Sequence, residues 1–337
     1  MDKKSLIAFS AVFLLFIAGC GSGDVATGAP TTPFLGGTQG LEISFLEGSP
    51  PAEVTDGGTF PFQVVLKFKN NGEFDLKKRD VNVSLIGFLA KDFNVNSKDV
   101  EGKGPDDDPL ARKKDSEGNI IESVETFVTF PSNTEYFDFK GKLAGNNVFV
   151  FRADVCYKYK TLAVSDICVL ENLVDPADNA ICNPSESKPI FSSASPLQIT
   201  SFRQNVAGKD KIQFSFDIVH SGTGDIFKGD ASTPYPDCPK TPTGRRTNED
   251  TVNVIVQTDI GSDSAKLNCV GLTTLQSEGI IIEQSNNVKL VNGRRTITCT
   301  QDLDSGRTDF TKKINANVTF DYLSSIDKEV LVKHLVD

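Results

Sequence analysis

Few residues of this 337-residue sequence have the types and spacing that catalysis needs. The two histidines are His220, in the body of the chain, and His334, near its end. Ser221 and Asp225 lie close to His220, but a nucleophilic triad also needs an oxyanion hole and a sharp nucleophile turn, and no G-x-S-x-G motif is present. We therefore expect His220 to be a turn residue at a strand end, and we expect neither enzymatic activity nor a cofactor.

A group of acidic residues could instead bind a cation. Five carboxylates occur close together in the sequence, those of Asp106, Asp107, Asp108, Asp115 and Glu117. Carboxylate oxygens are the hard ligands that Ca²⁺ prefers, but the spacing does not match an EF-hand loop. Lysines are interspersed among these acids, so we favour a solvated loop without a metal. A Ca²⁺ or small-ligand site is the alternative.

The cysteines favour disulfides over metal or redox chemistry. The sequence has seven, and the six that remain after Cys20 include no C-x-x-C pair. With two histidines in the chain, a zinc site of cysteines and histidines is poorly supplied. Leu267 and Cys269 lie on one face of a predicted strand, as do Ile297 and Cys299. This pattern predicts a disulfide between Cys269 and Cys299.

The other four cysteines lie in two kinds of surroundings. Cys156 and Cys168 occur in two apolar segments that look like neighbouring strands, which predicts a disulfide across a hairpin. Cys182 and Cys238 both lie in loop-like segments with nearby prolines. Pairing these two would complete three disulfides, the number expected of an exported chain with six such cysteines, and would join the two halves of the chain.

The N-terminal segment has the features of an export signal. Lys3 and Lys4 precede an apolar run over residues 6–19, which is shorter than the about 20 residues of a transmembrane helix and has the length of a signal-peptide core. The run ends in Phe16-Ile17-Ala18-Gly19-Cys20, which resembles the lipobox of bacterial and some archaeal lipoproteins. This resemblance implies that residues 1–19 are a signal peptide and that Cys20 carries diacylglycerol, which would anchor the protein at the extracellular face of the cell membrane.

The residues after the signal fit a flexible tether and an acidic body. Segment 20–37 is rich in Gly, Ser, Thr, Ala and Pro, a composition that cannot bury enough apolar surface to fold. Residues 1–19 contain two lysines and one aspartate, so the remaining chain has 33 (35 − 2) basic and 44 (45 − 1) acidic residues, a net charge of −11. Negative charge repels nucleic acids and anionic lipids, so we expect no nucleic-acid partner and membrane attachment through the lipid.

Alternating apolar residues indicate strands in the rest of the chain, and one pattern occurs twice. The first copy has apolar residues at every second position, followed by a turn: Phe62, Val64, Leu66, Phe68 and then Asn70-Asn71-Gly72. The second copy starts at residue 212: Ile212, Phe214, Phe216, Ile218 and then His220-Ser221-Gly222. Gln63 and Gln213 also match, as do Asp75-Leu76 and Asp225-Ile226. The repeat predicts two related halves.

We place the first domain at residues 38–195 and the second at 196–337, each long enough to bury a core. Further alternating segments are separated by Gly, Asn and Asp, and long amphipathic helical patterns are absent. The sequence therefore predicts an all-β fold of two tandem Ig-like β-sandwich domains, after a signal peptide and a flexible linker.

Short motifs connect the sequence to known surface proteins. The strand–Asn-x-Gly–strand unit resembles the Ig-like CARDB and S-layer-associated β-domains of archaeal and bacterial surface proteins. Segment 155–161, with Ile167-Cys168-Val169 and Cys182, is similar to predicted archaeal lipoproteins, and so is the pair Cys269 and Cys299. The resemblance implies the fold and the location at the cell surface, and it implies no activity, because a fold alone does not determine function.

Two sequons, Asn82-Val83-Ser84 and Asn317-Val318-Thr319, make Asn82 and Asn317 candidate N-glycosylation sites. Both lie within predicted strands, where the asparagine must face outward to carry a glycan. An unmodified chance tripeptide is the equal alternative.

These observations predict a lipid-anchored protein of the cell surface with a structural, adhesive or protein-interaction role. Its expected partners are the membrane, reached through the lipid, and other envelope proteins or glycans, which edge strands and the loops at the sheet ends would contact. The alternative is a small-ligand or calcium-dependent binding protein of the cell envelope. An envelope hydrolase is disfavoured because the chain has no credible nucleophile and base.

Overall fold

The computed structural model describes residues 32–132, 134–229, 233, 235–260, 266–277 and 280–335, with the backbone alone at 276–277 and 280–281. The chain divides into two compact units, Met1–Thr32 and Pro33–Asp337, and the second is the one described below. The predicted signal peptide, Cys20 and the first part of the tether lie outside the described residues. No helix in the described part is long and apolar enough to cross a membrane.

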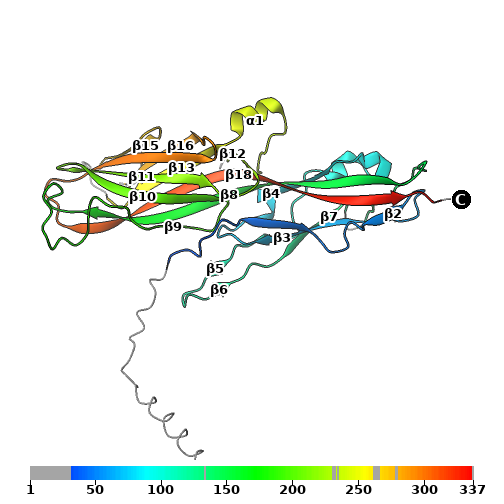
Figure 1. Cartoon of the computed structure of the whole chain (residues 1–337), viewed down its shortest axis with the longest axis horizontal. Helices are drawn as coiled ribbons and strands as arrows, with labels where there is room; N and C mark the ends of the chain where they lie inside the picture. Colours follow the sequence, from blue (N-terminus) through cyan, green and yellow to red (C-terminus); the bar gives the residue numbers. More distant parts are fainter. Residues whose placement is uncertain are drawn as a thin grey trace, which may run out of the picture. The chain divides into compact units, whose positions relative to one another are not determined.

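The described chain has an all-β fold, as predicted, with a few short helices between the strands (Figure 1). The strands are β1 (Leu41–Phe45), β2 (Glu53–Thr55), β3 (Val64–Asn70), β4 (Val81–Ile86), β5 (Lys113–Lys114), β6 (Ile120–Ile121), β7 (Thr126–Phe130), β8 (Asn147–Val169), β9 (Ile190–Ser192), β10 (Leu197–Gly208), β11 (Lys211–His220), β12 (Asp225–Lys228), β13 (Thr251–Thr258), β14 (Leu267–Cys269), β15 (Thr273–Ser277), β16 (Ile280–Lys289), β17 (Arg294–Asp302) and β18 (Phe310–Lys333). The helices are the α-helix α1 (Pro242–Asn248) and the 3-10 helices η1 (Lys78–Asp80), η2 (Ala90–Phe93) and η3 (Ser97–Val100).

Three larger sheets form the framework. One has the strand order β1-β3-β7, and a second has the order β10-β11-β17-β14. The third contains nine strands, with the path β15-β16-β13-β18-β8-β4 and with β2, β9 and β12 attached to its two longest members. The three-stranded and the four-stranded sheet each pack on the nine-stranded sheet. The buried apolar side chains lie between the two layers formed in this way.

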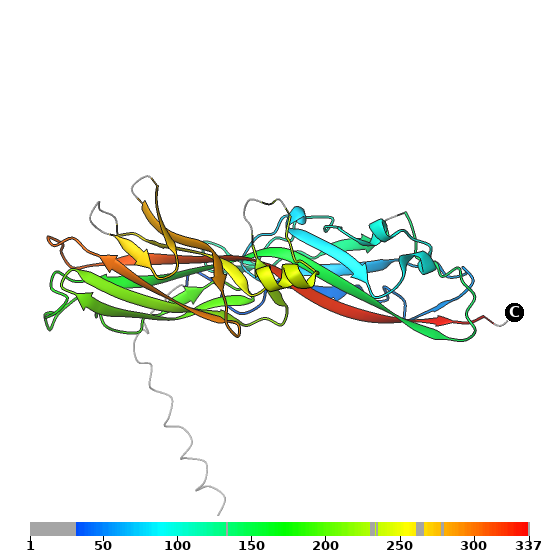
Figure 2. The ribbon, with the colours of Figure 1, turned by 90° about the horizontal axis from the view of Figure 1, so that it is seen from above.

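The strands β8 and β18 hold the two halves of the sequence together. They pair antiparallel over all 23 residues of β8, from Asn147 opposite Val332 to Val169 opposite Phe310. Figures 1 and 2 show them side by side, β8 in green and β18 in red and orange. β4 pairs with the first part of β8, whereas β13 pairs with the first part of β18. Each long strand therefore runs through two different packing regions.

The first of these, here called the β4 region, consists of the β1-β3-β7 sheet, β4, residues 147–158 of β8 and residues 321–333 of β18. Its core is rich in phenylalanine. The ring of Phe151 in β8 lies 5.8 Å from that of Phe62 and 5.6 Å from that of Phe137, and it stacks on Phe88 at 4.2 Å. Aromatic pairs at such distances add to the hydrophobic stabilisation of the core.

The second, the β13 region, consists of the β10-β11-β17-β14 sheet together with β15, β16, β13, residues 310–320 of β18 and residues 159–169 of β8. Polar side chains join its two layers. The Gln204 side chain in β10 bonds both to the N–H of Cys168, at 2.9 Å, and to its carbonyl, at 2.6 Å. Thr258 in β13 donates to Gln301 in β17 at 2.8 Å. These buried polar side chains are thus paired across the core.

The sequence repeat has a structural counterpart in these two regions. Leu41 of β1 pairs with Asn70 at the end of β3, and Leu197 of β10 pairs with His220 at the end of β11. Beside each of these strand ends lies a tyrosine of a long strand, described below. β8 begins at residue 147 and β18 at residue 310, and both continue for more than twenty residues. The same arrangement of strands therefore occurs twice.

The two sequence halves are nevertheless interleaved. The expected boundary between residues 195 and 196 falls between β9 and β10. Strands from both sides of it form the nine-stranded sheet, since β8 and β4 come from the first half and β18, β13 and β16 from the second. Each half completes its own region with part of the other half's long strand, so the core is shared within one compact unit.

Candidate functional site

The repeated turns are built around two tyrosine hydroxyls. At the end of β3 the Tyr159 hydroxyl donates to Asn70 Oδ1 at 3.1 Å, and the N–H of Gly72 donates to the same oxygen at 3.2 Å. At the end of β11 the Tyr322 hydroxyl lies 3.1 Å from His220 Nε2. These contacts explain why a polar residue ends each of the two matching strands.

The glycine in each repeated turn is required by space. A Cβ added to Gly72 would lie 1.7 Å from the Tyr159 hydroxyl oxygen, and one added to Gly222 would lie 2.2 Å from that of Tyr322. No real Cβ tolerates such a distance, so the two turn glycines that mark the sequence repeat are both positions where the backbone approaches a buried tyrosine.

His220 is the last residue of β11, and the structure gives it a structural role. Its ring bonds to Tyr322, and burial lowers its pKa against the opposing effect of Asp250 and Asp225. The Asp225 carboxylate is held by Arg245 at 2.9 Å and is not aligned as a triad partner. The expectation of a strand-end residue is therefore confirmed.

The disulfide between Cys269 and Cys299 is present, as predicted from the strand faces. The two residues lie directly opposite each other in β14 and β17, with Cα atoms 4.0 Å apart. Beside this disulfide, Glu283 of β16 is fully buried, and its carboxylate accepts a bond from the N–H of Cys269 at 3.0 Å. The bond joins the two layers of the β13 region.

The other two predicted pairings are wrong. Cys156 pairs with Cys238, and Cys168 pairs with Cys182. Cys156 and Cys168 both belong to β8, so they are not on neighbouring strands of a hairpin. Twelve residues of extended chain separate them by about 40 Å, at roughly 3.3 Å per residue, which no disulfide can span. Residues 157–167 contain no Gly, Pro or Asn, and this absence of turn residues was the signal for a continuous strand.

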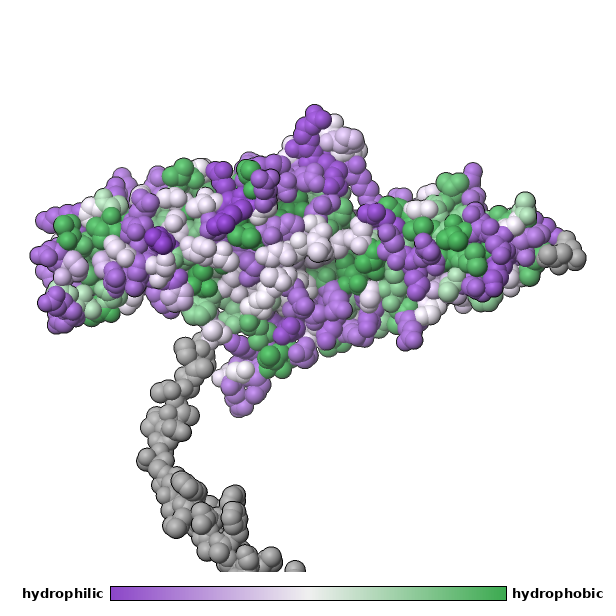
Figure 3. Space-filling model, viewed as in Figure 1, coloured by the Kyte–Doolittle hydropathy of each residue, from purple (hydrophilic) through white to green (hydrophobic). Residues whose placement is uncertain are grey.

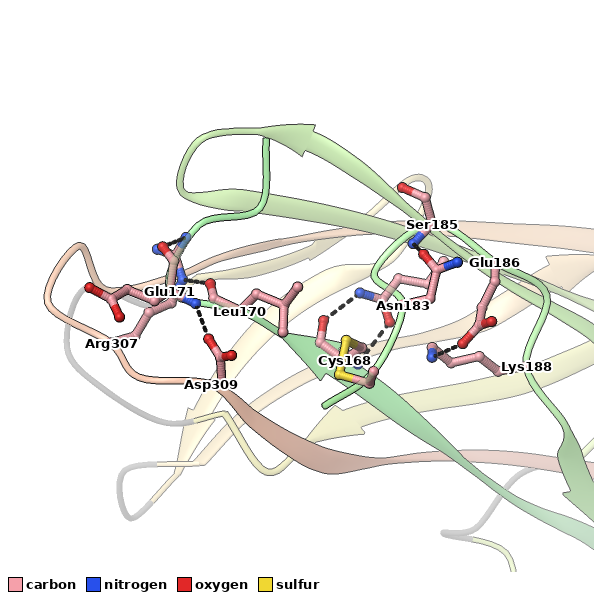
Figure 4. Close-up of a disulfide and its surroundings, with 11 residues drawn as sticks. Cys168, Leu170, Glu171, Asn183, Ser185, Glu186, Lys188, Arg307 and Asp309 are labelled. Atoms are coloured by element: carbon pink, nitrogen blue, oxygen red, sulfur yellow. Dashed lines mark hydrogen bonds and ion pairs between the residues drawn. A yellow bond between two sulfur atoms is a disulfide. The ribbon is translucent and has the colours of Figure 1, made fainter. Parts of the chain in front are cut away.

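The disulfide Cys168–Cys182 closes a loop at one end of the β13 region (Figure 4). Arg307 is buried against this loop, with its side chain 3% exposed. It donates to the carbonyls of Leu170 at 2.7 Å and Glu171 at 3.2 Å, while Asp309 accepts from the N–H of Glu171 at 2.6 Å. The loop is therefore fixed at its base by a covalent bond and by hydrogen bonds, and it borders an open hollow of about 1000 Å³.

A second segment that the sequence did not predict crosses the outer face of the long strands. We call residues 233 and 235–241 the strap. Cys238 ties the strap to Cys156 of β8, and the N–H of Asp237 donates to Asp321 Oδ2 of β18 at 2.7 Å. Cys156 and Asp321 lie near the middle of the two long strands, where the β4 and β13 regions meet. The strap thus covers the place where each strand passes from one region to the other.

The acidic residues offered as a calcium site do not converge. Asp115 closes the turn between β5 and β6, where its Oδ1 accepts from the N–H groups of Glu117 and Asn119 at 2.9 and 2.8 Å. A hydrogen bond from the Asn119 side chain, at 3.0 Å to Oδ2, and these backbone bonds lower the pKa of Asp115. Asp108 accepts from the N–H of Lys78 at 2.8 Å. Asp106 and Asp107 are exposed. No group of three or more His, Cys, Asp or Glu side chains in the described residues is placed to hold a metal ion.

The two sequons lie in strands. Asn82 of β4 is opposite Cys156, and its Oδ1 is buried without a hydrogen-bond partner among the described residues. Asn317 lies within β18 between Ile255 and Leu162, on the outer, partly exposed face of the nine-stranded sheet. Neither asparagine lies in a loop, and glycosylation at both stays a prediction.

The surface carries few concentrated features. On the face in Figure 3, hydrophobic residues are scattered among hydrophilic ones, and the projecting helix α1 is hydrophilic. No residue of α1 is buried. The side chain of Thr241 accepts a hydrogen bond from the N–H of Gly244 at 3.2 Å, which caps the start of this helix.

Comparisons with known proteins do not identify a family. No protein-family model matches the chain, and no curated protein matches it. Among solved structures, one similar chain is the serine-rich repeat adhesion glycoprotein of Streptococcus agalactiae, with 7% sequence identity and a TM-score of 0.18. The alignment covers 88% of this chain and 97% of that one. A similarity at this level supports no conclusion about fold or function.

Proposed function

We propose that this chain is a lipid-anchored protein on the extracellular face of the cell membrane, with a structural or adhesive role and no enzymatic activity. The observation that carries the proposal is that all six cysteines after Cys20 are paired in three disulfides. Such a set is typical of proteins that fold outside the reducing cytosol. Together with the lipobox-like sequence before Cys20, it favours export followed by retention at the membrane.

The architecture suits a cell-surface protein that must keep its folded structure under mechanical load. The shared strands β8 and β18 join both packing regions, and three disulfides cross-link the chain, with the Cys168–Cys182 loop inside the longer Cys156–Cys238 loop. Contacts with other envelope proteins or glycans would then fall to the loops at the ends of the sheets, which a rigid framework positions.

The anchor is tested by replacing the lipidated residue. Cys20→Ala, expressed in the native cells, should move from the detergent-soluble membrane fraction to the soluble or secreted fraction and should lose incorporation of an alkyne-labelled fatty acid. Ser22→Ala is the matched control, because it changes a neighbouring residue of the same segment and should leave both readouts unchanged. Membrane retention of Cys20→Ala without an uncleaved signal peptide would refute the lipid anchor.

The adhesive role is tested separately. Purified mature protein, coupled to beads, should bind envelopes prepared from the same cells, and reduced and alkylated protein should not, because its loops lose their framework. Equal binding by the native and the reduced protein would contradict a role that depends on this structure.

A further inference from the structure

A polar hollow opens on the β4 region, next to the phenylalanine core. Its volume is about 360 Å³, and it is lined by Pro61, by the segment 94–96 with Asp99, and by Glu135, Tyr136 and Asp138. The loop that supplies the segment 94–96 is closed by Asn94, which ends η2 in a left-handed conformation with φ of 59°. Asparagine tolerates this conformation better than most residues, so the loop conformation follows from the local sequence.

Hydrogen-bond acceptors dominate this hollow. Asp99, Glu135 and Asp138 bring carboxylates to it, and Asn94 and Asn96 bring side-chain amides. Asn96 Nδ2 donates to Asp99 Oδ2 at 2.8 Å, and Ser132 Oγ lies 3.1 Å from Glu135 Oε2, so these internal bonds orient two of the carboxylates. Among the described residues that line the hollow there is no lysine or arginine, and the nearby Lys140 pairs with Asp138. A ligand that fits it must therefore donate hydrogen bonds, and a phosphate or another anion would be repelled.

One of these carboxylates, that of Asp138, has one oxygen without a hydrogen-bond partner among the described residues. Asp138 is 9% exposed, and its N–H is held by the carbonyl of Phe93 at 3.0 Å. Lys140 occupies its Oδ2 at 2.5 Å, whereas its Oδ1 is buried with no hydrogen-bond partner in the described part of the chain. A buried acceptor left unpaired is unfavourable, so a donor group that reaches Asp138 gains a hydrogen bond that the described chain does not supply.

An aromatic ring completes the lining. Tyr136 is 51% exposed and lies at the hollow together with Pro61. An exposed ring beside acceptor groups suits a ligand with both hydroxyl groups and an apolar C–H face, because the ring can pack on that face while the acceptors take the hydroxyl protons. A divalent cation fits less well, since the acidic residues of the described chain nowhere converge in the threes that would hold one.

We propose that this hollow binds a neutral sugar residue of a surface glycan, through its vicinal hydroxyls and one C–H face. The inference rests on the proposed surface role and names its ligand class. The carboxylates of Glu135 and Asp138 and the amides of Asn94 and Asn96 accept and donate hydrogen bonds to the hydroxyls, and the Tyr136 ring packs against the sugar ring.

The test uses the full mature protein and a panel of neutral mono- and disaccharides, with binding followed by saturation-transfer NMR and by titration calorimetry. At least one neutral sugar should bind to the wild type. Tyr136→Ala and Glu135→Gln should each weaken that binding by about tenfold or more. Tyr235→Ala is the matched control, because Tyr235 is 63% exposed and lies in the strap, outside the hollow.

Both variants change exposed or half-exposed side chains, and an unchanged Tm shows that each remains folded. Absence of binding by any sugar of the panel would overturn the proposal, and so would binding that Tyr136→Ala and Glu135→Gln leave intact. Either result would leave the surface role standing if Cys20→Ala still releases the protein from the membrane. If Cys20→Ala stays on the membrane while the protein still binds the sugar, the lipid anchor is refuted and the hollow remains a sugar site.

Discussion

Removing the disulfide between Cys156 of β8 and Cys238 of the strap should destabilise the protein more than removing the disulfide between Cys168 and Cys182. Cys156 and Cys238 are separated by 82 residues, whereas Cys168 and Cys182 are separated by 14. A cross-link stabilises mainly by restricting the unfolded chain, and the restriction grows with the length of the closed loop. For these two loops the chain-entropy relation gives about 4.5 and about 3 kcal/mol.

The variant Cys156→Ala/Cys238→Ala should therefore lower the free energy of unfolding by about 4.5 kcal/mol. The measurement is equilibrium unfolding in urea, followed by far-UV circular dichroism, because the chain contains no tryptophan for fluorescence. Hydrogen exchange should show that the strap, residues 233 and 235–241, loses protection before the centres of β8 and β18 do, since the strap has lost its covalent tie to β8.

Asp237→Ala is the control for this experiment. It changes an exposed side chain of the same strap but keeps the N–H that donates to Asp321, so its effect should stay within about 0.5 kcal/mol. A loss of less than about 1 kcal/mol in the double cysteine variant, or an equal loss in Asp237→Ala, would refute the assignment of this stabilisation to the loop that the disulfide closes.

Three further predictions follow from the packing. Hydrogen bonds from His334 and from two backbone N–H groups lower the pKa of Asp56 to about 2. The ionised Asp56 therefore stabilises the fold above its unfolded pKa of about 3.9, and this stabilisation is lost as the pH falls from about 4 towards 2. Over that range Tm should drop in the wild type and should change less in Asp56→Asn. Gly222→Ala should lower the stability by about 1–3 kcal/mol in urea unfolding, because its Cβ would collide with the Tyr322 hydroxyl, and Gly306→Ala, with open space around it, should not; equal effects would contradict the steric reason. Scanning calorimetry of the mature protein should show one cooperative transition, because both packing regions share the two long strands, and two resolved transitions would show that the regions unfold separately.

Local patterns in the sequence accounted for the strands and for one disulfide. The alternation of apolar residues predicted β3 and β11, since residues at every second position must face the same side of a strand. Cys269 and Cys299 could be paired because each shares a strand face with an apolar neighbour, and the structure places them directly opposite each other. The alternation of apolar residues around each cysteine was enough to predict this disulfide, because the bond joins two adjacent strands.

The remaining disulfides could not be assigned in this way. Whether Cys156 and Cys168 occupy one strand or two depends on a turn that the sequence lacks, and the partner of Cys156 comes from a strap 82 residues away. The lining of the polar hollow likewise comes from three separate segments, around Pro61, Asn94 and Glu135, whose residue types are ordinary for exposed loops. No local pattern distinguishes such residues until the fold brings them together.

The sequence by itself determined the all-β class, the turn positions and the recurrence of one strand pattern in two halves, because these depend on the period of apolar residues and on the backbone preferences of Gly and Asn. The tertiary structure alone decided that the halves are interleaved. A strand alternates in the same way whether its neighbour comes from its own half or from the other, so the exchange of β8 and β18 leaves no trace in periodicity. It is determined by which edges pair and which faces pack, and those choices are made only when the whole core is assembled.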